Sequence, residues 1–179
     1  IISTGMATVG EIEQAVNTAT QAGCKDIVLL KCTSTYPATP DNTNLSTIPH
    51  LKDLFNVEVG LSDHTMGIGA AIASIPLGAS VIEKHFTLSR ADGGIDSAFS
   101  IEPHELSSLV TESRRAWQAI GKIKYGPTAK EIESTKYKRS IYASKNIKVG
   151  DIFNSENLKI IRPGDGAPPM LYPKLLGKC

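Results

Sequence analysis

The sequence predicts an α/β protein in which four strand–helix units precede the start of a small β domain. Four apolar segments begin about 25 to 30 residues apart, and helical patterns lie between them. The segments are continuous rather than alternating in polarity, which is typical of strands buried on both faces of a parallel sheet. These strands are predicted at residues 1–4, 27–32, 57–61 and 80–86.

Helix signals separate the strands in order. Thr8 and Glu11 have the spacing of a capping box, and Gly23 ends the first helix. A second, weaker helix is predicted over residues 47–55, and a third, rich in small residues, over 68–77. The fourth helix follows Glu102 and Pro103, a favourable pair for a helix start. Its apolar stripe comprises Leu106, Leu109, Val110, Trp117 and Ile120.

Two architectures contain consecutive βα units: half of a (β/α)8 (TIM) barrel, and part of a doubly wound sheet. No GxGxxG motif follows any strand, which weakens the dinucleotide-binding interpretation. Polar residues follow all four strands, as expected where the carboxyl ends of barrel strands meet at one mouth. The sequence therefore favours the barrel, although four strands cannot close one.

The composition changes after residue 122. Residues 1–122 are predicted to form the barrel half, and residues 123–139 a charged linker with a short helix. Residues 140–179 read as the start of a small β domain, with short strands at 140–143 and 158–161. Two strands are too few for an independent core, so we expect this domain to be incomplete.

Charge and cysteine usage limit the function classes. Of the 179 residues, 19 are Lys or Arg and 18 are Asp or Glu, so we expect neither nucleic acid nor an anionic membrane as a partner. No apolar run approaches the roughly 20 residues of a membrane span. Three cysteines without a spacing pattern fit a reducing cytoplasm. The chain begins inside a strand-like run without an initiator Met, so we expect a fragment.

Two neighbouring strands each end on a histidine beside a carboxylate. If these strands are adjacent, about 4.8 Å apart, His64 and His85 lie at one rim and can share a divalent metal. The alternative is a pair of hydrogen-bonded histidines that packs the rim. Asp63 and Glu83 are further candidate ligands, or a structural cap and an ion pair with Lys84.

Short hydroxyl residues also lie at strand ends. Ser3, Thr4, Ser34 and Ser62 can hold a phosphate together with loop amides, although Ser and Thr are common at such junctions. Tyr36 is either a hydrogen-bond donor at the rim or a packing residue.

Two further segments carry charged candidates. The long loop after His85 contains Asp92 and Asp96, and it is either a substrate lid or a surface connection. Arg162 lies in a rigid turn, where it binds a carboxylate or phosphate, or is a solvated charge.

Five strings together resemble the nonulosonic (sialic) acid synthases over essentially the whole chain: ISTGM, LLKCTSTYPA, GLSDHTMGIG, VIEKHFTLSR and IIRPGDG. The loop DGGIDSAFSIEP is similar to the pseudaminic acid synthase branch, and the GPDH-type loop of the sialic and legionaminic branches is absent. The resemblance implies the second half (strands 5–8) of a TIM barrel, followed by a truncated SAF, or antifreeze-like, domain. The missing first half supplies lysines and a glutamate in that family.

The implied reaction is a metal-assisted condensation in the cytoplasm. Phosphoenolpyruvate attacks the aldehyde of an open-chain 2,4-diacetamido-trideoxyhexose of the altrose type, giving pseudaminic acid and phosphate. The resemblance places a divalent metal (Mn, with Mg or Co as other options) on His64 and His85. It also implies a domain-swapped homodimer, and the isolated fragment is expected to be inactive.

Substrate contacts follow from the same resemblance. The phosphoenolpyruvate contacts fall on Ser3, Ser34, Tyr36 and Ser62, although the family usually has Asn at the position of Ser34. Asp96 and Arg162 match sugar-binding positions, the latter supplied by a second subunit, and Glu83 lies beside the sugar and metal.

Three alternatives stay open. The chain can belong to a sialic or legionaminic acid synthase that uses another N-acetylamino sugar. It can be a non-catalytic sugar-binding module, because the tail resembles antifreeze proteins. It can also be part of a different metal-dependent barrel enzyme, such as an aldolase, whose Schiff-base lysine would be Lys31 or Lys84.

Overall fold

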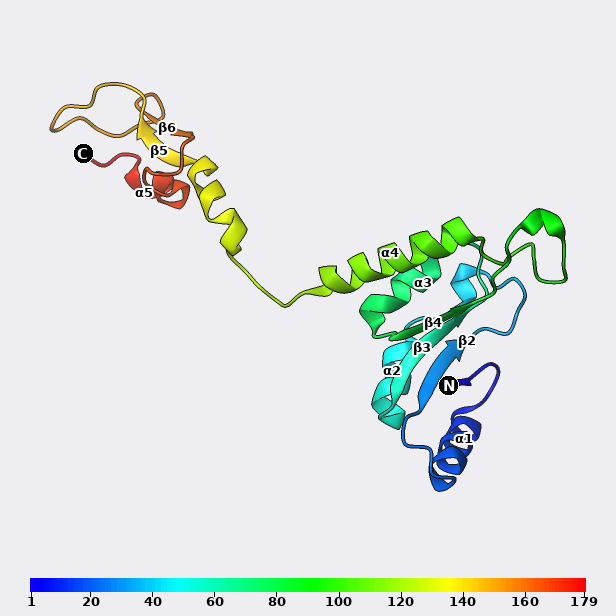
Figure 1. The fold of residues 1–179 in the computed structure, drawn as a ribbon. Helices are drawn as coiled ribbons and strands as arrows, with labels where there is room; N and C mark the ends of the chain where they lie inside the picture. Colours follow the sequence, from blue (N-terminus) through cyan, green and yellow to red (C-terminus); the bar gives the residue numbers. More distant parts are fainter. The chain divides into compact units, whose positions relative to one another are not determined.

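The computed structural model describes residues 1–179, which form two compact units, Ile1–Lys122 and Ile123–Cys179. The first unit is an α/β structure built on a four-stranded parallel sheet (Figure 1). Its strands are β1 (Ile2–Ser3), β2 (Val28–Cys32), β3 (Glu58–Asp63) and β4 (Val81–Lys84). The predicted α/β class and parallel sheet are therefore confirmed.

The helices of this unit lie between and after the strands, as predicted. They are α1 (Val9–Gln21), α2 (Thr47–Phe55), α3 (Gly69–Ser74) with the 3-10 turn η2 (Ile75–Leu77), and α4 (Pro103–Ile120). The Thr8–Glu11 capping box is present at the start of α1. Short 3-10 turns also lie in the connections, at η1 (Pro40–Asn42) and η3 (Arg90–Asp92).

All four helices pack on one face of the sheet. Leu29 and Val59 are register partners on β2 and β3, and they form a core cluster with residues of α1 and α2. Leu61 and Ile82 are partners on β3 and β4, and Ile82 packs against the cluster of α3 and α4. Because paired residues share a face of a sheet, the alternate residues of each strand, both apolar and polar, lie on the opposite face.

The strand order is sequential, β1-β2-β3-β4, with every pair parallel. Doubly wound sheets instead reverse their order at a switch point and carry helices on both faces. The sequential order brings the carboxyl ends of all four strands to the same edge.

The stripe predicted on α4 is only partly buried. Leu109 is 5% exposed and belongs to the core cluster of α3 and α4. Val110, Trp117 and Ile120 are 57%, 68% and 51% exposed, respectively. The apolar side of α4 therefore extends beyond the surface that this unit covers.

Gly60 allows the central strands to approach closely. A Cβ at this position would lie 2.3 Å from the carbonyl oxygen of Val81 and 2.6 Å from Cδ2 of Leu30. Leu30 is the register partner of Gly60, and its side chain occupies the space that a larger residue would need. The glycine is thus required by packing on the face opposite the helices.

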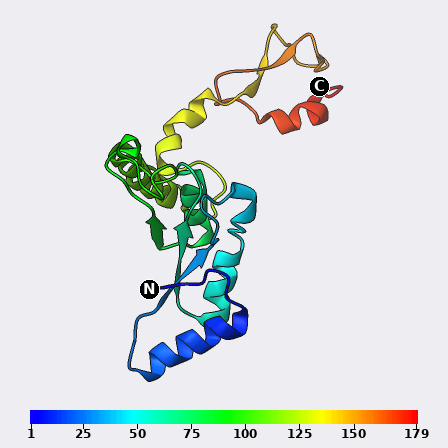
Figure 2. The same ribbon diagram turned by 90° about the vertical axis from the view of Figure 1, so that its right-hand side faces the viewer.

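The second unit contains one antiparallel strand pair, β5 (Ser140–Ala143) and β6 (Leu158–Ile161), where the sequence predicted two short strands (Figure 2). Two 3-10 turns precede it, η4 (Ala129–Glu131) and η5 (Glu133–Tyr137). The turn η6 (Pro169–Leu171) and the short helix α5 (Tyr172–Leu175) follow it. In neither unit does a helix combine the length and apolar character that a membrane crossing requires.

We predict that Gly60→Ala destabilises the first unit by about 1–3 kcal/mol, because the new methyl group meets backbone of β4 that cannot move without breaking the sheet. Gly10→Ala on α1 is the matched control, since a Cβ at that position would have no other atom within 4 Å. It should change the unfolding free energy by less than about 1 kcal/mol, in the stabilising direction. Urea unfolding of both variants tests this, and equal effects would contradict it.

Candidate active site

A row of polar side chains crosses the sheet on the face opposite the helices, at the carboxyl ends of the strands. Cys32, Ser62 and Glu83 are consecutive register partners on β2, β3 and β4. The buried Ser62 hydroxyl donates a hydrogen bond of 2.6 Å to Oε1 of Glu83. Glu83 itself is an exposed residue. One predicted hydroxyl and one predicted carboxylate are therefore joined directly.

His64 follows β3 and is 7% exposed. Its Nδ1 lies 2.9 Å from the carbonyl oxygen of Thr33. Since a carbonyl can only accept, Nδ1 carries the proton in this hydrogen bond, and the Nε2 lone pair is free to bind a metal. This is the usual second contact of a metal-binding imidazole.

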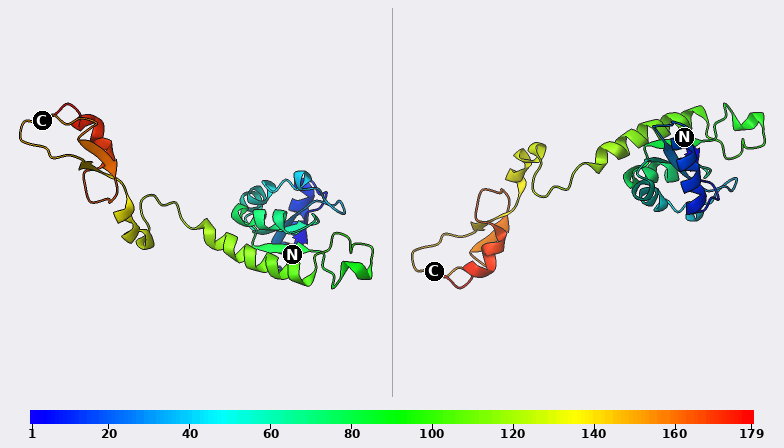
Figure 3. Two further views of the ribbon diagram at one scale, coloured as in Figure 1. Left: turned by 90° about the horizontal axis from the view of Figure 1, so that it is seen from above. Right: turned by 90° about the horizontal axis from the view of Figure 1, so that it is seen from below.

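His85 follows β4 and lies beside His64. The two ring centroids are 5.2 Å apart with an interplanar angle of 72°. Nδ1 of His85 is 3.4 Å from Oδ2 of Asp96, a carboxylate from the loop between β4 and α4. That loop is drawn in green in Figure 3. The fold thus brings together both predicted histidines and one predicted sugar-binding carboxylate.

Two aromatic rings line the histidine pair. The Tyr36 ring centroid is 4.4 Å from that of His64 and 5.9 Å from that of His85. The backbone of Ala38 donates to the carbonyl of His64, which holds the Tyr36 segment in place. Phe99, which is 6% exposed, packs on His85 with centroids 5.0 Å apart.

The remaining predicted hydroxyls of the first unit lie near this row. The Ser34 Oγ is 3.7 Å from Sγ of Cys32, and Sγ is also 4.0 Å from Nδ1 of His64. Ser3 is exposed and pairs with Leu30, on the same face of the sheet as the polar row. Thr4 instead points its hydroxyl to the carbonyl of Leu30 and is buried.

Asp63 has a structural partner on the helix-covered face. Its Oδ2 lies 2.9 Å from Nζ of Lys84, and both side chains are almost fully buried, at 0% and 3% exposed. Lys84 also donates to the carbonyl of Thr65, whose amide donates to Asp63 Oδ1. Of the two roles considered for Asp63, the structure therefore contains the ion pair.

Neither strand lysine points to the histidines. Lys31 is a register partner of Leu61 on the helix face, and its ammonium group donates to the carbonyl of Cys32 and the hydroxyl of Thr33. Burial lowers the pKa of Lys31. Because Lys31 and Lys84 both lie on the helix side of the sheet, the arrangement disfavours either of them as a Schiff-base lysine beside the histidines.

Arg162 belongs to the second unit and is exposed at the end of β6. The turn after it is fixed by the amide of Gly164, which donates to the carbonyl of Lys136 at 2.9 Å. The Tyr142 hydroxyl donates to the carboxylate of Asp165, and its oxygen lies 3.2 Å from the carbonyl oxygen of Pro163. The predicted rigid turn is therefore present.

A second group of possible metal ligands lies at the start of α4. Ligand atoms of Glu102, His104 and Glu105 lie within 4.8 Å of one another. However, Arg90 donates to both glutamates, and its guanidinium charge opposes a cation there. The histidine pair is therefore the better candidate for a metal centre.

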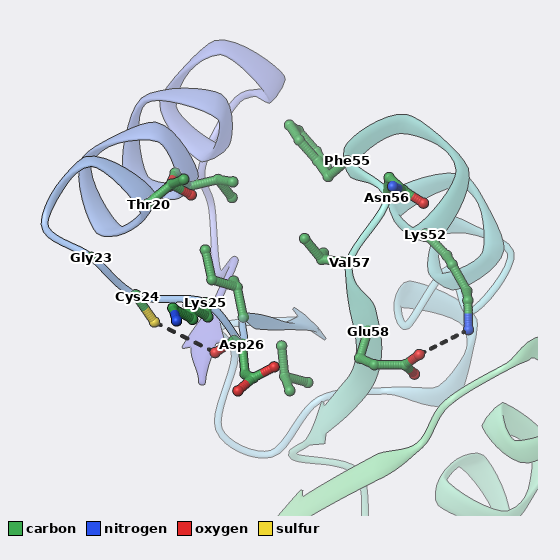
Figure 4. A pocket seen from close by; sticks show the side chains of 13 residues that line it. Thr20, Gly23, Cys24, Lys25, Asp26, Lys52, Phe55, Asn56, Val57 and Glu58 are labelled. Atoms are coloured by element: carbon green, nitrogen blue, oxygen red, sulfur yellow. Dashed lines mark hydrogen bonds and ion pairs between the residues drawn. The ribbon is translucent and has the colours of Figure 1, made fainter.

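A cleft of about 770 Å³ lies at the opposite end of the strands (Figure 4). Phe55 and Val57 contribute apolar walls to it, and Lys52 pairs with Glu58 at its edge. It contains none of the predicted site residues. We give more weight to the histidine edge, because a parallel sheet gathers its functional side chains at the carboxyl ends of its strands.

The sequence interpretation did not single out Cys32, Phe99 or Arg90. Side chains alternate along β2, so Cys32, two residues after Leu30, lies on the same face of the sheet as Leu30. This alternation is a sequence signal that predicts the face of Cys32. Phe99, which packs on His85, and Arg90, which binds the Ser100 carbonyl, both belong to a long irregular loop, for which no periodicity exists.

Family models and related proteins both point to the same protein family. Residues 1–125 match the model of the NeuB family, and residues 138–179 match that of the SAF domain. The chain is 44% identical over 99% of its length to pseudaminic acid synthase of Campylobacter jejuni. It is also 44% identical, again over 99%, to N,N'-diacetyllegionaminic acid synthase of the same organism. The alignments cover 52% and 54% of those proteins, so the chain spans about half their length.

Solved structures give the same result. The N-acetylneuraminic acid (sialic acid) synthetase of Leptospira borgpetersenii, solved with citrate, has a TM-score of 0.66 and 40% identity. The match covers 75% of this chain and 47% of that one. The spore coat polysaccharide biosynthesis protein SpsE of Bacillus subtilis has a TM-score of 0.63 and 32% identity, over 97% of this chain and 54% of its own.

We predict that Lys84→Met destabilises the first unit by about 3–5 kcal/mol, because it leaves the Asp63 carboxylate buried without its partner. Lys52→Met is the matched control, since Lys52 and Glu58 are 48% and 57% exposed. It should cost less than about 1 kcal/mol. Denaturant unfolding measures both free energies. A cost for Lys84→Met no larger than that for Lys52→Met would refute the stabilising role of the buried Asp63–Lys84 ion pair.

Proposed function

Because the chain belongs to the NeuB family and carries a SAF domain, we propose that it is the carboxyl-terminal half of a nonulosonic acid synthase. In this proposal residues 1–122 are strands 5–8 of a (β/α)8 barrel, residues 123–139 are a linker, and residues 140–179 begin the SAF domain. The relatives are about twice as long as this chain. We refer to the protein with both barrel halves as the complete synthase, and expect the isolated half to be inactive.

The sheet supports the barrel assignment. Its order is sequential, its strands are all parallel, and its helices lie on one face, which is the arrangement of four consecutive barrel units. In a closed barrel the polar row of Cys32, Ser62 and Glu83 would face the interior, at the mouth where active sites of this fold are built.

The proposed reaction joins phosphoenolpyruvate to an open-chain amino sugar. Carbon 3 of phosphoenolpyruvate forms a bond to the aldehyde carbon, whose oxygen becomes a hydroxyl. Water adds at carbon 2, and phosphate leaves as the 2-keto acid forms. The atoms balance without an oxidant or reductant.

The single observation that carries the proposal is the arrangement of His64 and His85. Their rings lie side by side, and the protonated Nδ1 of His64 leaves Nε2 free for a metal. These residues fit a divalent ion such as Mn, with Mg or Co as other options. When bound, such an ion polarises the sugar aldehyde as a Lewis acid.

The other side chains have binding roles in this proposal. Ser3, Ser34, Tyr36 and Ser62 hold phosphoenolpyruvate by hydrogen bonds, and Ser34 has a hydroxyl where the family usually has an amide. Because a hydroxyl has one proton, Ser62 can donate either to phosphoenolpyruvate or to Glu83, but not to both. Substrate binding would therefore free the Glu83 carboxylate.

Two charged residues complete the sugar site. Asp96, beside His85, accepts hydrogen bonds from the sugar. Arg162 is proposed to come from the SAF domain of a second subunit, in a domain-swapped homodimer. Its fixed turn suits a residue that must be presented at another surface.

The branch rests on the loop DGGIDSAFSIEP, because overall identity is the same, 44%, to a pseudaminic and to a legionaminic acid synthase. We propose 2,4-diacetamido-2,4,6-trideoxy-altrose as the sugar and pseudaminic acid as the product. The second candidate is a legionaminic or sialic acid synthase, which that equal identity supports.

We predict that His64→Ala and His85→Ala each weaken Mn binding to the complete synthase by at least about 100-fold, more than is typical for loss of an outer contact. His50→Ala is the control, since His50 is exposed on α2. Isothermal titration calorimetry gives the affinities. Wild-type affinity in either of the first two variants would remove the metal centre from the proposal.

Phosphate release from phosphoenolpyruvate tests the branch. The altrose sugar should be used with a kcat/KM at least about 100-fold above that for N-acetylmannosamine, because a site built to hydrogen-bond two acetamido substituents leaves polar groups unpaired when the sugar has only one. The diacetamido sugar used by legionaminic acid synthases is the second comparison. Turnover with N-acetylmannosamine and none with the altrose sugar would overturn the branch assignment.

A further inference from the structure

The loop between β4 and α4 closes beside His85. The amide of Ile101 donates to the carbonyl of His85 at 2.9 Å, and the amide of Thr87 donates to the carbonyl of Ile101 at 3.0 Å. These bonds form a parallel bridge between Phe86 and Ile101. The two ends of the loop are thus joined next to the candidate metal ligand.

Arg90 ties the interior of this loop to the first turn of α4. Its Nη1 donates to the carbonyl of Ser100 at 2.9 Å and to Oε2 of Glu105 at 2.5 Å. Its backbone amide donates to Oε1 of Glu102 at 2.8 Å. Glu102 is the N-cap of α4, and Glu105 closes the capping box by accepting from the Glu102 amide. The Arg90 guanidinium therefore joins the last part of the loop, at Ser100, to the first turn of α4, at Glu105.

From Ser100 the contacts continue to the site. The amide and the hydroxyl of Ser100 both donate to the carbonyl of Asp96, at 3.2 and 2.8 Å. The Asp96 carboxylate in turn lies 3.4 Å from Nδ1 of His85. Ser100 and Ile101 are 4% and 1% exposed, so the middle of this path is buried, whereas the Asp96 and His85 side chains at its end are 44% and 33% exposed.

The charges at the helix start support this path. The hydrogen bond from Arg90 lowers the pKa of Glu105, and the same bond raises the pKa of Arg90. The hydrogen bond therefore favours the charged form of both groups. The cluster of Glu102, His104 and Glu105 is then better explained as an anchor for Arg90 than as a cation site.

We propose that Arg90 is a positioning residue for sugar binding: it holds Ser100 against α4 and thereby sets the Asp96 carboxylate beside His85. Arg90 sets the affinity for the amino sugar without touching it. This inference rests on the proposed function, because the role of Asp96 as a sugar ligand belongs to that proposal.

The test compares Arg90→Gln and Arg90→Lys with Arg115→Gln in the complete synthase. Arg115 is a matched control, since it donates to Glu112 on the same helix at 2.6 Å but is 70% exposed. Arg90→Gln should raise KM for the sugar about tenfold, the effect of losing one charged hydrogen bond, and leave KM for phosphoenolpyruvate within about twofold. Arg90→Lys should recover part of the loss, because one ammonium keeps the charge but not the fork.

Amide hydrogen exchange gives a readout that needs no turnover. Arg90→Gln should speed exchange at Ser100 and Ile101 and leave α1 and α2 unchanged. Exchange that is unchanged, or that rises equally in α1 and α2, would overturn the positioning role, as would an equal rise in both KM values. If wild-type synthase makes no condensation product, the proposed function fails, and exchange alone decides whether Arg90 positions the loop.

Discussion

The parallel register between β3 and β4 is the constraint on which the candidate site depends. It pairs Asp63 with Lys84, and the residues that follow each of them are His64 and His85. A slip of one residue would exchange the two faces of a strand. It would turn Ser62 toward the helices and Asp63 toward the opposite face. The buried ion pair makes such a slip costly. The slip would separate Asp63 from Lys84, and each charge would lose its partner without gaining contact with water.

This register divides structure from chemistry by the faces of one sheet. The helix face carries the apolar clusters and the Asp63–Lys84 pair. The opposite face carries Ser62 and Glu83, and the segments that leave it bring Tyr36 and Asp96 to the histidines. Side chains of alternate residues therefore serve stability and function in turn, which explains why the SDH and EKH strings hold so many polar groups next to one another.

Local signals made much of the fold predictable. The bounds of α2, 47–55, and the Thr8–Glu11 capping box follow from spacing within a few residues. So do β5 and β6, which the structure forms at 140–143 and 158–161. The meeting of His64 and His85 was also accessible, because carboxyl ends of neighbouring parallel strands share an edge.

Other features depend on contacts that no local pattern describes. Val110, Trp117 and Ile120 fit the apolar stripe of α4 yet are mostly exposed, since periodicity indicates which side is apolar but not whether a partner covers it. Phe99 and Arg90 lie in a loop whose path is held by single hydrogen bonds, such as that from Arg90 to Ser100. The choice between the two roles of Asp63 likewise required the register.

The central claim is that His64 and His85 bind one divalent ion at this edge of the sheet. Pulsed electron paramagnetic resonance of the Mn²⁺-loaded complete synthase, with ¹⁵N-labelled histidine, tests it most directly. The account predicts hyperfine coupling from two imidazole nitrogens. A spectrum with Mn²⁺ bound and no histidine nitrogen coupling would contradict it.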